Sequence, residues 1–333
     1  MNIRLQFTET AVLVASVWGF HAQPLLAYVT LSPPGAAETI ASLVSGGNVA
    51  GGYDASLDGD FTSAFFWSGS TYTTLEPGGT GVTPVGMSGN NVVGVCSAGS
   101  FLWGGTHYAT ISVPGATDTN VWAVDGSKVV GSCSTGGFLW DGATYAAIGA
   151  PAWGASTVPR CISGNYVAGD YNDASGAEHI FVWNGSTYTT LDVPGVSYAN
   201  AGAVNSSGEV ILCYYTGQSL SPSYSLWDGR DLVSPPNALA GGRAVGFSGD
   251  SVVGCAPAPT SSGLGGFVWD GSSYTTFDVP GPVDCTDGVS VAGWYYDASG
   301  DIEGYVETIP TPEPATLALL ALGGLAALRR RRR

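Results

Sequence analysis

The chain has 333 residues, enough for one large all-β domain or two ordinary domains, and only 11% of them are charged. Its 50 glycines, with much Ser, Thr, Asn and Asp, indicate many tight turns and therefore many short strands. The net charge is −16, and outside its two ends the chain has only four basic residues, which excludes binding to a nucleic-acid phosphate backbone.

Residues 1–27 are interpreted as a secretory signal peptide. Arg4 supplies the positive end, and residues 11–20 are largely apolar. Either of two short segments, ending at Ala22 or at Ala27, has the pattern that precedes a cleavage site. An ordinary buried segment is the alternative.

An internal repeat occupies the middle of the chain. Segments that begin at Phe65, Phe181 and Phe267 share the pattern Phe-x-Trp-x-Gly-Ser-x-Tyr-Thr-Thr, and weaker copies begin at Phe101, Phe138 and Ser225. The marker tryptophans lie 36 to 44 residues apart, which is the period of propeller blades. These tryptophans are Trp67, Trp103, Trp140, Trp183, Trp227 and Trp269.

Each repeat has the pattern of four short strands, which the fourth unit shows best. We expect an inner strand at Cys161–Ser163 and a second strand at Tyr166–Tyr171. Phe181–Trp183 then forms the third strand, and Asn184-Gly185 is a strong hairpin signal. Tyr188–Leu191 forms the outer strand.

The two ends of the repeat region complement each other. Tyr28–Leu31 has the pattern of an outer strand with no unit before it, whereas the seventh unit stops at Gly304–Val306, where its outer strand should begin. Pairing these segments would remove exposed strand edges. We therefore predict an all-β fold for residues 28–309: a seven-bladed β-propeller of four-stranded blades, closed by the N-terminal strand. An open β-solenoid is the alternative.

The repeats resemble the HAF-type extracellular repeat, which has a His-Ala-Phe core and often a Val-Val-Gly strand upstream. Ser63–Phe65 keeps the Ala and Phe of that core, His179–Phe181 keeps the His and Phe, and Gly265–Phe267 keeps the Phe. The resemblance implies an extracellular location and a repeated architecture, and it assigns no activity.

The sequence contains no motif for catalysis, so no catalytic residue and no cofactor site are predicted. His107 and His179 occupy different positions of the repeat and are expected to be surface or turn residues. There is no Gly-x-Ser-x-Gly elbow and no phosphate-binding loop.

Three acidic loops, at 54–60, 170–178 and 297–303, carry alternating oxygen side chains that could ligate calcium. Each loop falls between the second and third strands of its repeat, where Asp-Ala-Ser-Gly is also good turn chemistry. We favour turns and predict no metal site. Loss of thermal stability on adding a chelator would support calcium.

The repeated aromatic residues are expected to form the core between blades, because they recur in every unit. Trp122, Trp153 and Trp294 break the repeat and are the better candidates for an exposed ligand surface.

Six cysteines in an exported protein permit three disulfides. Cys133–Cys161 and Cys255–Cys285 are the preferred pairs, because each joins a second strand to the first strand of the next unit, over similar separations of 28 and 30 residues. Cys96 and Cys213 lack such a partner, and a role as small buried hydrophobic residues is equally compatible with the pattern.

The C-terminal segment 310–333 has three parts in order. Pro312, Glu313 and Pro314 precede an apolar run at 315–328, and five arginines end the chain. The 14 apolar residues span about 21 Å as a helix, so length alone leaves a buried helix possible. The flanking prolines and the arginines favour a transmembrane helix with the arginines in the cytoplasm. The basic tail consists of Arg329, Arg330, Arg331, Arg332 and Arg333.

This segment resembles the PEP-CTERM sorting signal of Gram-negative bacteria. The resemblance implies recognition and cleavage near Pro312–Pro314 by a membrane exosortase. It further implies transient membrane anchoring, followed by delivery to the cell surface or to an exopolysaccharide matrix.

We therefore predict an exported, non-enzymatic surface or matrix protein whose propeller is a binding or structural module, with extracellular polysaccharide as a candidate partner. The alternative is a secreted carbohydrate-active hydrolase or lyase on a propeller scaffold. Too few titratable residues depart from the repeat to assemble a catalytic cleft.

Overall fold

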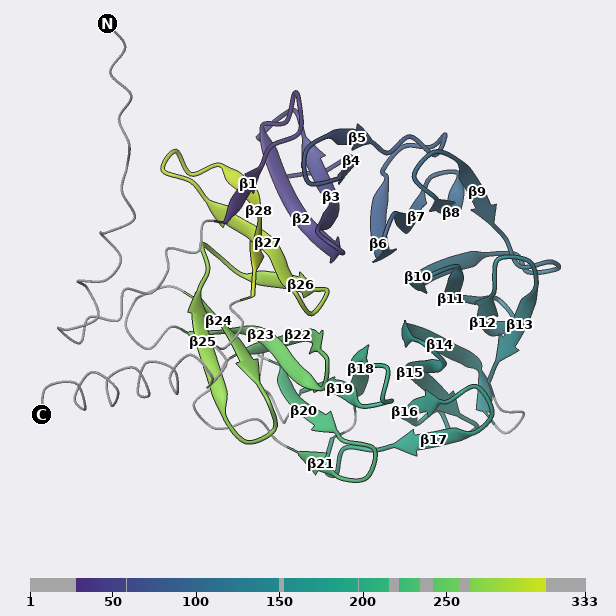
Figure 1. Ribbon diagram of the computed structural model, residues 1–333. Coiled ribbons are helices and arrows are strands. Elements are labelled where there is room, and N and C mark those ends of the chain that lie inside the picture. The colour runs from purple at the N-terminus through teal and green to yellow at the C-terminus, as the bar shows by residue number, and fades with distance from the viewer. Residues whose placement is uncertain are drawn as a thin grey trace, which may run out of the picture.

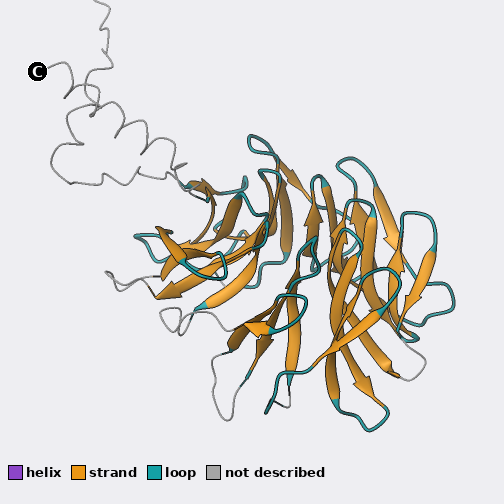
Figure 2. Cartoon of the chain, turned by 60° about the horizontal axis from the view of Figure 1, so that its bottom comes forward, coloured by secondary structure: helices purple, strands orange, loops and turns teal. Residues whose placement is uncertain are grey.

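The computed structural model describes residues 28–57, 59–149, 153–196, 198–215, 222–233, 242–257 and 264–309. These residues form strands joined by turns and loops, and they contain no helix (Figure 2). No helix long and apolar enough to cross a membrane is therefore found in this part of the chain. The predicted signal peptide at 1–27, and the tail at 310–333 with its predicted helix at 315–328, lie outside the described residues.

The strands form seven antiparallel four-stranded sheets, the blades, arranged around a common axis with the first strand of each sheet nearest to it (Figure 1). Blade 1 is β2 (Glu38–Ser45), β3 (Asn48–Asp54), β4 (Ser63–Trp67), β5 (Tyr72–Thr74); blade 2 is β6 (Thr83–Ser88), β7 (Asn91–Cys96), β8 (Gly99–Trp103), β9 (Tyr108–Ile111); blade 3 is β10 (Thr119–Asp125), β11 (Lys128–Cys133), β12 (Gly136–Trp140), β13 (Tyr145–Ile148). Blade 4 is β14 (Trp153–Ser163), β15 (Tyr166–Asp173), β16 (Glu178–Trp183), β17 (Tyr188–Leu191); blade 5 is β18 (Ala199–Val204), β19 (Val210–Tyr214), β20 (Ser223–Trp227), β21 (Leu232–Val233). Blade 6 is β22 (Arg243–Ser248), β23 (Ser251–Pro257), β24 (Leu264–Trp269), β25 (Tyr274–Asp278); blade 7 is β26 (Val283–Thr286), β27 (Ser290–Tyr296), β28 (Ile302–Thr308), with β1 (Val29–Leu31).

Blade 7 is completed by the N-terminal strand, as predicted. β1 is antiparallel to β28, and Val29, Thr30 and Leu31 pair with Val306, Tyr305 and Gly304 respectively. Leu31 and Val306 then pack against Ala41 and Phe65 of blade 1. The chain therefore closes into a ring of seven blades, and the open solenoid is wrong.

The inner strand of every blade has a β-bulge at the same level. The pairing register skips one residue there, and the facing position of the second strand is glycine in six of the seven blades. A Cβ added at Gly131 would lie 2.7 Å from the Phe138 ring and closer still to the Asn120 carbonyl oxygen, so a side chain has no room there. This contact explains the repeated Val-Gly pair. The skipped residues are Ser42, Val85, Trp122, Arg160, Gly202, Val245 and Asp284.

The aromatic markers of the repeat join neighbouring blades. The Tyr188 ring packs edge-on against Phe181 at 6.0 Å, and its hydroxyl accepts a hydrogen bond from the Gly149 N–H at the end of blade 3. Tyr72, Tyr108 and Tyr145 accept the same bond, from the N–H groups of Ser32, Glu76 and Ser112. Because Ser32 follows β1, the bond to Tyr72 also crosses the closing seam.

A second set of bonds links the turns between first and second strands. In each case a turn glycine at positive φ donates its N–H to a side chain at the end of the inner strand of the preceding blade, or, for Asp287, directly after it. The donor–acceptor pairs are Gly89–Ser45 (2.8 Å), Gly126–Ser88 (2.9 Å), Gly164–Asp125 (2.6 Å) and, across the seam, Gly46–Asp287 (2.7 Å).

Two details of the sequence prediction change. β14 is longer than the predicted Cys161–Ser163, because it starts at Trp153, and Trp153 pairs with Asp173 beyond a second irregularity in the register. The marker tryptophans lie between blades as expected, yet only Trp103 and Trp269 are fully buried. The other four are half-buried, and Trp183 stacks on Tyr188 at 6.0 Å.

All six cysteines are free thiols in the structure, so neither predicted disulfide is formed. In the first pair, the Cys133 sulfur contacts the Gly136 carbonyl of its own hairpin, and the Cys161 sulfur donates to the Ala168 carbonyl of its own blade. Matched sequence offsets therefore do not bring these sulfurs together. Cys285 likewise bonds within its own blade, to Ala292, whereas the Cys255 sulfur reaches across to the Val283 carbonyl.

Candidate binding site

The titratable cluster that departs most clearly from the repeat lies at the start of β16. His179 pairs across the sheet with Tyr171, and their rings stack at 5.1 Å. Its Nδ1 lies 2.8 Å from the Asp192 carboxylate, and its Nε2 lies 3.4 Å from that of Asp173. His179 is thus a half-buried strand residue between two carboxylates, which corrects the predicted surface or turn position. His107 is exposed in a turn, as predicted.

The two carboxylates hold His179 toward its charged form. The hydrogen bond to Asp192, and secondarily that to Asp173, raises the pKa of the imidazole above its usual value. Asp173 accepts hydrogen bonds from the Ser175 hydroxyl and the Ala177 N–H, which lower its pKa to about 2. The cluster therefore fixes the loop between β15 and β16 through a charged, hydrogen-bonded network.

This network does not have the arrangement of a catalytic triad. A general-base histidine needs one ring nitrogen free to face a nucleophile, with the other held by a carboxylate. In His179 both nitrogens face aspartates, and the nearby Ser175 hydroxyl is itself bonded to Asp173. The cluster is built to position the backbone.

A cavity of about 450 Å³ borders this cluster, where blade 4 meets the connection to blade 5, and His179 and Asp192 are among its lining residues. Residues alternate in direction along a strand, so Tyr171 and His179 face blade 3, whereas Asn172, Glu178 and Ile180 face blade 5. Among the described residues Glu178 makes no hydrogen bond or ion pair, and its carboxylate is available to a ligand. The apolar part of the lining is Ile180, Leu191, Val193, Val196 and Ala199.

An exposed aromatic pair adjoins this cavity. Tyr198 lies in the chain between two lining residues, Val196 and Ala199, and it is 43% exposed. Its ring centroid is 6.3 Å from that of Tyr215, which is 41% exposed. A polar pocket beside exposed tyrosines suits a ligand with both hydroxyl groups and apolar faces.

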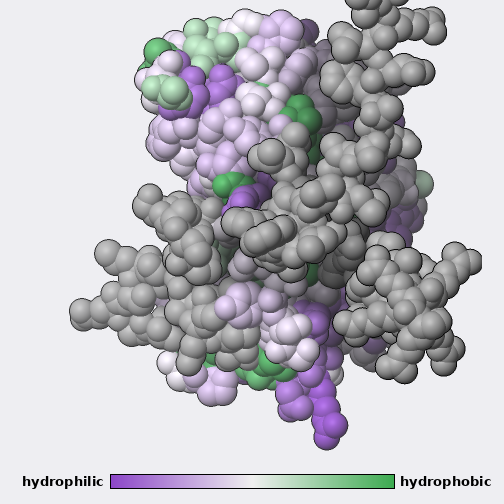
Figure 3. Space-filling view, turned by 60° about the vertical axis from the view of Figure 1, so that its left-hand side comes forward, coloured by the Kyte–Doolittle hydropathy of each residue, from purple (hydrophilic) through white to green (hydrophobic). Residues whose placement is uncertain are grey.

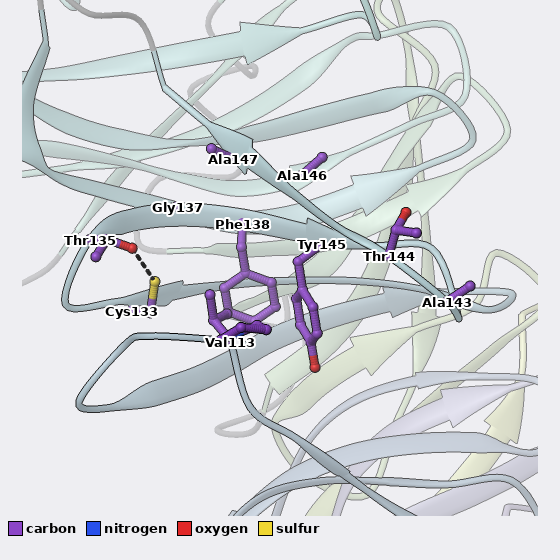
Figure 4. A pocket seen from close by; sticks show the side chains of 11 residues that line it. Val113, Cys133, Thr135, Gly137, Phe138, Ala143, Thr144, Tyr145, Ala146 and Ala147 are labelled. Atoms are coloured by element: carbon purple, nitrogen blue, oxygen red, sulfur yellow. Dashed lines mark hydrogen bonds between the residues drawn. The ribbon is translucent and has the colours of Figure 1, made fainter.

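Two other cavities flank the connection from blade 2 to blade 3. The larger, about 490 Å³, is lined mainly by apolar groups, with Phe138 and Tyr145 side by side and Cys133 hydrogen-bonded to Thr135 (Figure 4). The smaller, about 200 Å³, corresponds in position to the blade 4–5 cavity. When the two repeats are aligned at Phe101 and Phe181, Ala98 occupies the position of Glu178, and Asp118 occupies that of Tyr198.

The tryptophans that break the repeat have separate environments. Trp122 occupies the inner-strand bulge of blade 3, is 37% exposed, and donates its indole N–H to Ser132. The Arg160 guanidinium lies over its ring at 5.5 Å. Trp294 is half-buried against Tyr296, and of Trp153 only the backbone is described. Trp122 therefore belongs to blade 3 and Trp294 to blade 7.

Arg160 also connects three blades. It forms an ion pair with Asp170, which is 3% exposed and accepts a bond from the Ala201 N–H of blade 5 at 3.1 Å. Burial raises the pKa of Asp170 to about 6 despite the guanidinium. This link is structural, because the Arg160 guanidinium, the Asp170 carboxylate and the Ala201 N–H are bonded to one another.

The acidic loops hold turns. Asp297 accepts hydrogen bonds from the N–H groups of Ser299 and Asp301, and Asp54 accepts them from the N–H and hydroxyl of Ser56. In the described ranges, no three His, Cys, Asp or Glu side chains are grouped so that they could hold a metal ion.

Residues 310–333 match the PEP-CTERM protein-sorting motif, which confirms the sequence-based resemblance. The motif implies an exosortase-sorted protein that is exported through the membrane to the surface of a Gram-negative bacterium. Pro312, Glu313, Pro314 and Arg329–Arg333 belong to this match and lie outside the described residues. A comparison with curated proteins found no match.

The solved structures similar to this chain include a β-propeller domain. The β-propeller domain of the Trilobed protease from Pyrococcus furiosus, described as having an open velcro topology, aligns with a TM-score of 0.56 at 10% identity, over 84% of this chain and 100% of that one. YCF48 bound to a D1 peptide aligns with a TM-score of 0.49 at 11% identity, over 85% of this chain and 97% of that one. The SapL1 lectin in complex with α-methyl fucoside aligns with a TM-score of 0.40 at 16% identity, over 72% of this chain and 95% of that one. The first likeness confirms the propeller fold, and none of them assigns an activity.

Proposed function

We propose that this chain is a non-enzymatic binding protein of the cell surface or exopolysaccharide matrix, and that its propeller binds extracellular polysaccharide. The sorting motif supports the location. The proposal includes the resemblance of the repeats to the HAF-type extracellular repeat. From Phe65 onward, each repeat corresponds to one blade.

The observation that carries the binding proposal is the blade 4–5 cavity. Its volume of about 450 Å³ is within the range of small-ligand sites. Glu178 and Asn172 offer acceptor and donor groups to sugar hydroxyls, and the aliphatic wall suits the C–H faces of a pyranose. The exposed pair Tyr198 and Tyr215 extends the surface along which a longer chain would lie.

The non-enzymatic role is part of the same proposal. Glycoside hydrolysis usually needs two carboxyl groups that face one another across the scissile bond. Of the two carboxylates that line the cavity, Asp192 is bound by the His179 ring, which leaves only the Glu178 carboxylate to face a ligand. The proposal therefore assigns binding to the cavity and no bond cleavage.

The test is a glycan array probed with the exported full-length product, together with two variants. Glu178→Gln and Tyr198→Ala should each weaken binding to the recognised glycan about tenfold or more, as expected for loss of one central contact. Asp118→Ala, at the position that corresponds to Tyr198 in the connection from blade 2 to blade 3, is the matched control and should leave binding unchanged. Equal binding by all variants would remove the cavity from the proposal, and cleavage of the glycan would replace binding by catalysis.

A further inference from the structure

The seam of the ring contains a buried carboxylate that the repeat does not explain. Val291 pairs with Glu307 and Gly293 with Tyr305 in blade 7, as Val49 pairs with Trp67 and Gly51 with Phe65 in blade 1. Glu307 therefore occupies the position of the marker tryptophan, which is aromatic in every other blade. It is 4% exposed, and among the described residues neither of its carboxylate oxygens has a hydrogen-bond partner. A buried carboxylate without a partner is costly, so it indicates a missing cationic or donor group.

No basic side chain of the described residues can fill this role. Arg160 is paired with Asp170, Arg243 with Asp284 at 2.7 Å, and Arg230 lies 3.8 Å from Asp231. Lys128 donates to the Gly164 carbonyl and to Asn165. The groups that interact with Glu307 are acidic or aromatic: Asp278 of β25, Tyr305 on its own strand, and Tyr28, whose ring also packs against Tyr295 of β27. Burial, with a smaller contribution from Asp278, raises the pKa of Glu307 to about 7.

The backbone that faces Glu307 belongs to the first described residue. Val29 pairs with Val306, so one further step of the same register places Tyr28 opposite Glu307. The Tyr28 ring packs against Tyr295 at 5.6 Å and Tyr305 at 6.2 Å, on the same face of the blade as Glu307. Directly opposed residues of an antiparallel pair have Cα atoms about 4.5–5.5 Å apart, which is within the reach of a glutamate side chain.

We propose that Tyr28 is the mature N-terminus, and that its α-ammonium group, created when the leader is removed, forms an ion pair with Glu307 and locks the closing strand onto blade 7. In the cleavage, water adds across the Ala27–Tyr28 amide bond. The carboxylate leaves on Ala27, and the amine stays on Tyr28, where it takes up a proton at neutral pH because α-amino groups titrate at about 7.7–8.0. Processing thus supplies the cation that the buried carboxylate lacks.

The experiment begins with the full chain produced in a Gram-negative host, followed by identification of the first residue of the exported product. We expect Tyr28. A product that begins elsewhere, for instance after Ala22, overturns the proposal.

The ion pair itself is tested by titrating the amine. Reductive ¹³C-methylation labels only the α-amino group and Lys128, the single lysine of the chain, so the two NMR signals are easily separated. The α-amine of the wild-type product should titrate about one pKa unit or more above its ordinary range, because a close carboxylate stabilises the charged form. In Glu307→Gln this elevation should disappear, whereas the control Glu303→Gln, on the same face of β28, should keep it.

A wild-type α-amine with an ordinary pKa overturns the ion pair, even where the N-terminus is Tyr28. This measurement needs no variant, so it holds if Glu307→Gln fails to fold. Failure here would leave the polysaccharide-binding proposal untouched, because blades 4 and 5 lie away from the seam in the ring (Figure 1).

Discussion

Replacing Gly131 by alanine tests why a glycine faces the inner-strand bulge. The new Cβ would lie 2.7 Å from two atoms of the Phe138 ring and closer still to the Asn120 carbonyl oxygen. Real Cβ atoms do not approach this closely, so either the buried ring or the bulged backbone must move. Both are packed between blades 2 and 3, since Phe138 is 2% exposed. Overpacking of this kind costs about 2–3 kcal/mol.

For a domain of this size, that loss corresponds to a fall in Tm of about 3–5 °C. The assay is thermal and urea unfolding of the exported protein, followed by circular dichroism. Gly202→Ala is the matched control. Gly202 is the bulge residue of blade 5, where Leu212 takes the place of the facing glycine, and a Cβ there would meet nothing closer than 3.4 Å. The control should change stability by less than about 0.5 kcal/mol. Equal losses in the two variants would refute the steric explanation of the Val-Gly repeat.

Three further predictions concern the blade contacts, the His179 cluster and the thiols. Tyr188→Phe should cost about 1 kcal/mol of unfolding free energy, because the Gly149 N–H loses its acceptor. Tyr274→Phe should leave the unfolding free energy unchanged, because the Tyr274 hydroxyl has no partner among the described residues. Urea unfolding compares the two variants. His179 has a raised pKa, so its contribution to stability is present below about pH 6.5 and is lost as the pH rises through the raised value. The wild type should therefore lose more stability than His179→Gln between pH 6 and pH 9. Equal losses would contradict the hydrogen bonds assigned between His179 and the two aspartates. Thiol titration of the denatured protein should find all six cysteines without reductant, and thiols that appear only after reduction would restore the disulfide prediction.

The repeat made most of the fold predictable. The period of about 40 residues, the Asn-Gly and Asp-Gly hairpin signals and the alternation of Phe181 with Trp183 are local patterns, and each has a direct structural counterpart. The closing strand was also predictable, because Tyr28–Leu31 repeats the pattern of Tyr188–Leu191. Closure of the ring also forms contacts that were not predicted, such as the hydrogen bond from the Ser32 N–H to the Tyr72 hydroxyl.

The features that the sequence did not predict depend on three-dimensional placement. The bulged residues share no chemistry, since they include Ser42, Trp122 and Asp284, so no motif marks them. His179 was assigned to a surface or turn position because its partners, Asp173 and Asp192, lie 6 and 13 residues away in the chain and no local motif joins them to it. The structure has free thiols where two disulfides were predicted, and sequence offsets do not specify which side of a blade a cysteine faces.

The candidate cavity was partly foreseeable. Its aromatic neighbour Tyr198 is an unrepeated tyrosine in a connection, and Glu178 belongs to one of the acidic loops singled out for calcium. What the sequence lacks is the alternation that turns Glu178 toward blade 5 and His179 toward blade 3. Figure 3 shows the side of the ring that holds blades 6 and 7, where the apolar surface of the described residues occurs as small separate patches.

Ring closure by the N-terminal strand is the central claim, and amide hydrogen exchange of the exported protein tests it most directly. The peptide that covers Val29–Leu31 should exchange as slowly as the peptide that covers Gly304–Val306, because the two segments form one antiparallel pair. Fast exchange of Val29–Leu31 beside a protected Gly304–Val306 would show that blade 7 lacks its fourth strand, and it would contradict the closed seven-bladed ring.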